Sequence, residues 1–165
     1  MITMKAYKIS RNSHYCDFSG INFHSGKLDF SKKVIFHESC YYDFLNGNSY
    51  DVNKLCGLSH GIHLEDSVRF GWLPNFKKKK IEVYGYLHNT GIITFMKICD
   101  VDVNTKIDVN WKYLDERVYF SVYNGKETFN TDMAYEKPNF LLGYYLNPYF
   151  GGDNKAPRDM KIFIE

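Results

Sequence analysis

The chain contains about eleven short segments rich in strand-forming residues, and clusters of Gly, Asn, Asp and Ser separate them. Pairs such as Asn124-Gly125 and Gly151-Gly152 provide the positive backbone dihedrals of tight turns. Many short strands at this spacing predict an all-β fold, a two-sheet antiparallel β-sandwich. The predicted strands are Lys5 to Ile9, Lys27 to Phe30, Lys33 to His37, His60 to Leu64, Ser67 to Trp72, Lys80 to Leu87, Ile92 to Ile98, Ile107 to Tyr113, Arg117 to Tyr123, Gly143 to Tyr149 and Met160 to Ile164.

Helical periodicity is weak, and we expect at most one short helix. Asp51 could cap a turn in which Val52, Leu55 and Leu58 recur at a spacing of three, so a single helical turn is predicted over 51–58. No linker or repeat divides the 165 residues, which predicts one sandwich domain over 1–165. Pro148 lies inside a strand-like run and favours an edge position or a bulge there.

Charge and composition limit the classes of partner. The net charge is +2 and the only basic run is Lys77 to Lys80, whereas a nucleic-acid surface needs a broader basic stripe. No apolar run approaches the roughly 20 residues that cross a bilayer, so no membrane partner is expected. The chain starts without an apolar signal segment, which predicts a cytoplasmic protein, with association with a virion as an alternative. Four cysteines without a CxxC pair are expected to be reduced, partly buried thiols.

Period-2 alternation sorts side chains into two faces of a sheet. In the run 67–72 it assigns Val68, Phe70 and Trp72 to the core and leaves Arg69 on the other face. The same alternation predicts Ile62 and Leu64 in the core, and Tyr145 on one face with Asn147 and Tyr149. If the strands are neighbours, their outward residues form one open face. The predicted ligand-binding residues are His63, Arg69, Tyr84, Tyr86, His88, Asn147 and Tyr149.

An open sheet face lined by Tyr and Arg suits an extended glycan. Sugar rings stack on aromatic side chains, while Arg, Asn and His donate hydrogen bonds to hydroxyl groups. The alternative is that the tyrosines only cover a second buried face. The same residue types also suit β-elimination on a uronic-acid glycan, where Arg or Asn neutralises the carboxylate and Tyr or His transfers protons. The residues for those roles are Arg69, His63 or His88, Asn147, and Tyr84 or Tyr149.

Other chemistries lack their motifs. A glycosidase needs two carboxylates across the scissile bond, and no paired strand motif of that kind occurs. The run from Asp100 begins like a calcium loop, but Thr105 and Trp111 occupy the positions where an EF-hand has Gly and Glu. A structural calcium built from Asp153, Asn154 or Asp159 is a minor alternative. We expect no metal and no cofactor.

Three stretches carry a family resemblance: 53–63, 67–72, and 147–152 with 156–160. They resemble a group of small jelly-roll proteins of Bacteroidetes and their phages, and more broadly the strand pattern is similar to the concanavalin-A-like lectin and glucanase architecture. This resemblance implies a jelly roll whose concave sheet binds glycan. The chain departs from the catalytic branches because it lacks their paired acids, and from alginate-lyase-like members because it lacks a Gln-x-His strand.

The sequence thus predicts a non-enzymatic β-jelly-roll module. It binds carbohydrate or serves as an accessory structural component of a larger assembly, such as a phage particle, with protein partners there. The alternative is a polysaccharide lyase acting by β-elimination.

Overall fold

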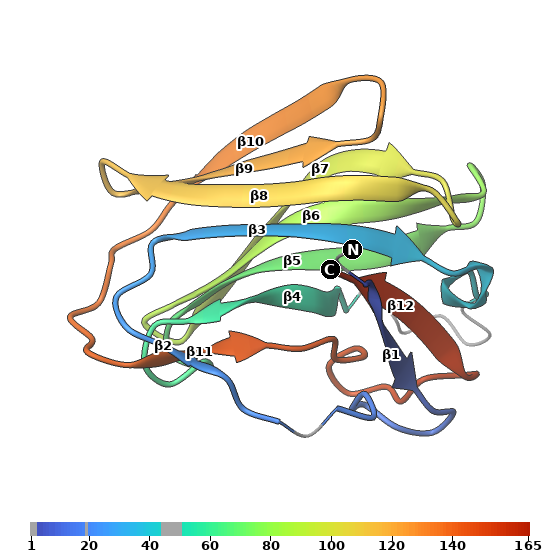
Figure 1. Cartoon of the computed structure of the whole chain (residues 1–165), viewed down its shortest axis with the longest axis horizontal. Coiled ribbons are helices and arrows are strands. Elements are labelled where there is room, and N and C mark those ends of the chain that lie inside the picture. Colours follow the sequence, from blue (N-terminus) through green and yellow to red (C-terminus); the bar gives the residue numbers. More distant parts are fainter. Residues whose placement is uncertain (1–2, 19, 44–50) are drawn as a thin grey trace.

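A computed structural model describes residues 3–18, 20–43 and 51–165, and they form two antiparallel six-stranded sheets packed face to face (Figure 1). The first sheet, in the order β1-β12-β3-β8-β9-β10, contains β1 (Lys5–Ile9), β12 (Met160–Ile164), β3 (Asp29–Phe36), β8 (Lys106–Leu114), β9 (Arg117–Tyr123) and β10 (Thr128–Ala134). The second, in the order β2-β11-β4-β5-β6-β7, contains β2 (Phe23–His24), β11 (Gly143–Leu146), β4 (Asn53–Ser59), β5 (Ser67–Asn75), β6 (Lys80–Asn89) and β7 (Ile92–Val101). The predicted β-sandwich is confirmed.

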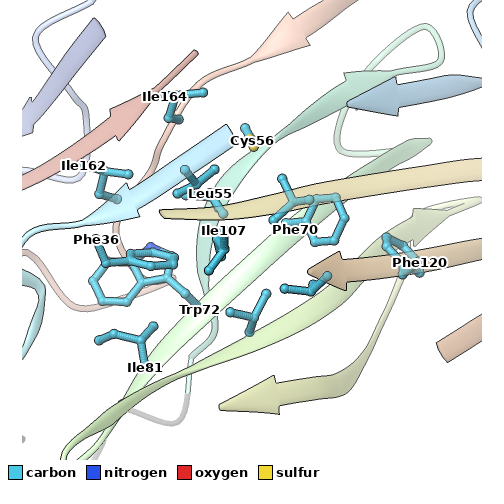
Figure 2. Close-up of a cluster of buried hydrophobic side chains, with 14 of the residues drawn as sticks. Phe36, Leu55, Cys56, Phe70, Trp72, Ile81, Ile107, Phe120, Ile162 and Ile164 are labelled. Atoms are coloured by element: carbon cyan, nitrogen blue, oxygen red, sulfur yellow. The ribbon is translucent and has the colours of Figure 1, made fainter. Parts of the chain in front are cut away.

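The core lies between the sheets and is built from alternate residues of each strand. Phe70 of β5 meets Phe120 of β9 edge to face, with ring centroids 5.4 Å apart. Phe36 of β3 meets Trp72 of β5 at 5.6 Å. These aromatic rings and the aliphatic side chains around them fill the space between the two sheets (Figure 2). Burial of each such side chain contributes about 2 kcal/mol to folding.

Several predicted elements need correction. The helical turn predicted over 51–58 is wrong, because β4 occupies Asn53–Ser59 and a register shift between Lys54 and Cys56 disturbs its alternation. The strand predicted from His60 to Leu64 is also wrong. This segment turns, and Ile62 and Leu64 are exposed rather than in the core. Prediction missed β2 and β10, and it split β3 in two.

The structure also describes the cysteines, the helical content and the question of a membrane-spanning helix. All four cysteines are free thiols, as predicted, and three of them are buried. The one helical element in the described ranges is a three-residue 3-10 turn, Glu38–Cys40. None of the described residues forms a helix that is long and apolar enough to cross a membrane.

Candidate functional site: a groove beside Arg69

Arg69 lies on the face of the second sheet that points away from the core. Arg69 belongs to β5, which lies between β4 and β6. Gly57 of β4 and Tyr86 of β6 pair directly with Arg69. Gly57 is required here, because an added Cβ would lie 2.1 Å from the Val68 carbonyl oxygen and 2.6 Å from Arg69 Cα. The missing side chain lets β4 approach β5 closely and keeps space beside the Arg69 side chain.

A groove of about 290 Å³ runs along this face, and we call it the Arg69 groove. Arg69 and His63 form one wall. The segment from Tyr144 to Tyr149, which contains β11 and the residues after it, forms another. The N-terminal segment supplies the rest of the wall with Tyr15, Cys16, Phe18, Gly20 and Ile21.

The Arg69 guanidinium is buried without a protein counter-ion. Only 6% of the residue is exposed, no Asp or Glu in the described ranges forms an ion pair with it, and its Nε has no hydrogen-bond acceptor. Burial lowers the pKa of Arg69 to about 10, although nearby tyrosines, Tyr86 first, oppose this shift. A buried cation without a partner is costly, and an anionic ligand group would remove that cost.

A second cation, Lys54 of β4, lies close to Arg69. Its Nζ donates to the Gly151 carbonyl oxygen at 3.1 Å and lies 5.0 Å from the centroid of the Tyr86 ring. Burial lowers the pKa of Lys54 to about 8, and the positive charge of Arg69 adds to the shift, while Asp51 opposes it. This face is therefore electropositive and poorly hydrated.

Two histidines complete the polar surroundings. His63 Nδ1 lies 2.6 Å from the Tyr144 hydroxyl oxygen, and both residues line the groove. Burial lowers the pKa of His63, and the charge of Arg69 adds to this, so its imidazole is neutral at pH 7. His88 Nδ1 donates to the Leu64 carbonyl oxygen at 2.8 Å, and burial lowers its pKa too.

The mouth of the groove is aromatic. The Tyr149 ring stacks on His14 with centroids 5.4 Å apart. Tyr15 meets the Tyr149 ring edge to face, with centroids 5.2 Å apart. Tyr15 is 72% exposed. A flat, partly exposed aromatic surface beside a buried cation can stack a sugar ring and pair with its charged substituent.

The predicted site residues fall into three groups: those that line the groove, two buried residues of β6, and Tyr84, which lies further along that strand. His63, Arg69, Asn147 and Tyr149 line the groove together. Tyr86 and His88 share the outward face of β6, but each is less than a tenth exposed. They do not line the groove, so the expectation of one open face is corrected.

Contacts above the sheet explain this burial. Val52 and Leu73 pack on Tyr86, and the turn after β4 meets His88 through Leu64. Tyr84 lies further along β6, where its hydroxyl donates to Glu82 at 2.5 Å. It does not line the groove either.

Tyr145 lines the groove together with Asn147 and Tyr149, as predicted, but it does not lie wholly on the outer face. Tyr145 packs partly against the core, whereas Tyr144 contacts His63 on the outer face. Beyond Pro148, Tyr149 bridges Lys54 of β4, so the pairing with β4 continues past the end of β11. Sequence reasoning missed two residues of this region, Tyr144 and Lys54. Alternation along β11 could have indicated Tyr144, but the disturbed register of β4 hid Lys54.

Comparison with solved structures supports the sandwich fold. The chain is similar to a functionally unknown protein from Saccharomyces cerevisiae, with a TM-score of 0.58, 9% identity, and coverage of 97% of this chain and 83% of that one. It is also similar to an alginate lyase from Klebsiella pneumoniae, with a TM-score of 0.51, 8% identity, and coverage of 83% of this chain. This chain spans 56% of the lyase's length. No family model matches the sequence, and no curated protein matches it. At these identities the likeness defines the fold class, a jelly-roll β-sandwich.

Among the residues that the structure describes, no group of three or more His, Cys, Asp or Glu side chains is placed to hold a metal ion. The chemistry of the groove is that of an arginine, a neutral histidine, an asparagine and tyrosines, with Lys54 close to the arginine.

Proposed function

We propose that the Arg69 groove binds an acidic polysaccharide and holds a sugar carboxylate against the Arg69 guanidinium. One observation carries the proposal: Arg69 is 6% exposed, lines a groove and lacks an ion-pair partner in the described ranges. Arginine binds carboxylates through two parallel N–H donors, and the sugar ring would stack on the exposed aromatic residues at the groove mouth. The similarity in fold to an alginate lyase, an enzyme named for a uronic-acid polymer, supports the same class of ligand.

Calorimetric titration tests this function. Tetrasaccharides of mannuronate, guluronate and galacturonate are compared with the neutral xylotetraose. We expect the acidic sugars to bind and the neutral one to bind at least tenfold more weakly. Loss of a charged hydrogen bond costs about 1.5 to 3 kcal/mol, so Arg69→Met should weaken binding by roughly 10- to 100-fold.

Arg69→Lys is the matched variant, because it keeps the charge but loses the paired donors. It should bind with intermediate affinity. Equal affinity for acidic and neutral tetrasaccharides, or an Arg69→Met variant that folds and binds normally, would contradict the proposed function.

A second candidate, a polysaccharide lyase, is favoured by one specific contact, the 2.6 Å separation of His63 Nδ1 and the Tyr144 hydroxyl oxygen beside Arg69. With the carboxylate neutralised by Arg69, neutral His63 would remove the C5 proton, and Tyr144 would supply the hydroxyl that serves as the acid. The C4–O bond would then break as a C4–C5 double bond forms, and the leaving oxygen would take a proton from the hydroxyl.

Ultraviolet absorbance of unsaturated uronate products distinguishes this candidate from binding alone. A lyase would release such products from alginate, glucuronan or pectate, and Tyr144→Phe would abolish the signal while tetrasaccharide binding remains. Saturable binding without any absorbance change across the panel would exclude the lyase and leave the binding function intact.

A further inference from the structure

A second space, on the inner side of β11, has a different chemistry. A cleft of about 440 Å³ lies between the first sheet and β11, and Phe30, Lys32, Trp111 and Tyr145 line it. An adjoining space of about 270 Å³ shares Phe30, Lys32 and Tyr145 with it. We call the larger space the inter-sheet cleft. Its size is typical of sites for small molecules.

The inter-sheet cleft contains hydrogen-bond donors that lack acceptors. Trp111 is 2% exposed and its Nε1–H has no partner, which is unusual for a buried donor. Lys32 shares the inward face of β3 with Phe30 and Val34. It lies close enough to Cys56 of the opposite sheet for its positive charge to oppose the rise that burial causes in the pKa of that thiol. No described residue forms a hydrogen bond or an ion pair with the Lys32 side chain.

Tyr145 adds a third donor. Its hydroxyl oxygen accepts a hydrogen bond from Lys27 Nζ at 2.8 Å, so its own proton is available to a ligand. Asp29 is the carboxylate among the described lining residues, and alternation along β3 assigns it to the outward face, opposite to Phe30. The inward side chains therefore offer donors and a cation to a ligand.

The rest of the inner lining is apolar. Phe30 and Trp111 are paired residues of β3 and β8, and their rings stack with centroids 6.2 Å apart and an interplanar angle of 9°. A ligand for this cleft thus needs an apolar body that packs on the aromatic pair and an anionic end that accepts hydrogen bonds.

We infer that the inter-sheet cleft is a binding site for a small monocarboxylate with an apolar body. The carboxylate accepts hydrogen bonds from Trp111 Nε1, Lys32 Nζ and the Tyr145 hydroxyl, and the hydrocarbon part packs against Phe30. This site is separate from the Arg69 groove, which lies on the outer face, although Tyr145 lines both.

The two tryptophans of the chain allow a direct test by 19F NMR of protein labelled with 5-fluorotryptophan. The probe is sodium hexanoate, and hexanamide is its neutral counterpart. We expect hexanoate to shift the Trp111 resonance saturably, because Trp111 lines the cleft, and to leave Trp72 of the closed core unchanged. The resonance that disappears in a folded Trp72→Phe or Trp111→Phe variant belongs to the replaced tryptophan, so one such variant assigns both resonances.

Adjacent lysines of β3 provide matched variants. Lys32→Met should weaken hexanoate binding at least tenfold, because its side chain faces the cleft. Lys33→Met should not change it, because Lys33 pairs with Glu165 at 3.3 Å. Arg69→Met should also leave hexanoate binding unchanged.

Four results would overturn the inference: no saturable shift, equal binding of hexanamide, normal binding by Lys32→Met, or loss of the shift in Arg69→Met. If Arg69→Met alone abolished the shift, the carboxylate would be bound in the outer groove. The inter-sheet site would then be rejected while the proposed glycan function would stand.

Discussion

The immediate environment of Arg69 determines what the outer groove can bind. Burial lowers the pKa values of Lys54, His63 and His88, and the positive charge of Arg69 lowers each of them further. None of the described acids forms an ion pair with the guanidinium, so the positive charge of Arg69 stays unpaired. Each added proton on this face costs free energy in the empty protein, and a bound anion would recover that cost.

The pH dependence of binding follows from this coupling. In the free protein the pKa of His63 is below its ordinary value of about 6.5, and a bound carboxylate would raise it. Binding therefore takes up a proton, and affinity for an acidic tetrasaccharide should rise as the pH falls from 7 to 5, where sugar carboxylates remain ionised. Calorimetry at several pH values measures this slope.

His63→Gln should flatten that slope. His37→Gln is the control, because His37 precedes the 3-10 turn, contacts Ser39 within it and does not line the groove. An affinity that is constant between pH 7 and 5 in the unmodified protein would show that His63 does not sense the bound anion.

At the scale of single strands, the approach of β4 to β5 is the feature on which the groove depends. Gly57→Ala would place its new Cβ against backbone atoms of β5, which cannot move without separating the two strands. Overpacking of this kind typically costs about 1 to 3 kcal/mol, and the free energy of unfolding in urea should fall by an amount at the upper end of that range.

Gly85→Ala of β6 is the matched comparison. There the new Cβ would lie 2.9 Å from the Phe120 ring, a side chain that can adjust. We expect Gly85→Ala to be the milder change and to leave tetrasaccharide binding intact, whereas Gly57→Ala should lose it. The reverse order of effects would mean that the close approach of β4 and β5 is not what maintains the groove.

Strands with regular alternation were predictable from the sequence, and irregular ones were not. Val68, Phe70 and Trp72 alternate without interruption, so the orientation of Arg69 followed directly. β4 could not be recognised, because its register shift brings Leu55 and Cys56 to the core in succession. β10 was missed because, within Thr128–Ala134, only Met133 is buried.

The site was predictable to a similar degree. Alternation identified Arg69, Tyr84, Tyr86 and His88 as residues of one face, and this is confirmed by the pairing of β5 with β6. It could not show that Val52 and Leu73 cover Tyr86, since that contact joins segments distant in sequence. It also could not place the N-terminal segment along the groove.

For the molecule as a whole, one buried histidine makes stability depend on pH. His60 follows β4 and is 2% exposed, and its Nδ1 lies 2.7 Å from the hydroxyl oxygen of Tyr135, which follows β10 of the other sheet. Burial, with the nearby His24 as a smaller cause, lowers the pKa of His60 to about 4. In the unfolded chain it would be about 6.5.

Between these two pKa values the unfolded chain binds more protons than the folded one. The free energy of unfolding should therefore fall as the pH decreases from 6.5 to about 4, by on the order of 3 kcal/mol from this group. Urea unfolding at pH 7 and pH 4.5 measures the change. His60→Phe should lose less stability over that interval than the unmodified protein. His37→Gln should lose as much stability as the unmodified protein does. Identical losses in all three would assign acid sensitivity to other groups.

The position of β12 has a consequence for how the protein is made. This strand lies between β1 and β3, pairing Lys5 with Ile164 and Phe36 with Ile162 (Figure 1). During synthesis, β1 and β3 must therefore wait for β12 to leave the ribosome before either gains this partner. Until then each exposes an unpaired edge to other nascent chains, and such non-local pairing slows folding. Ribosome-bound chains that stop before Met160 should thus be the species most prone to aggregate, and the ones that most need a chaperone.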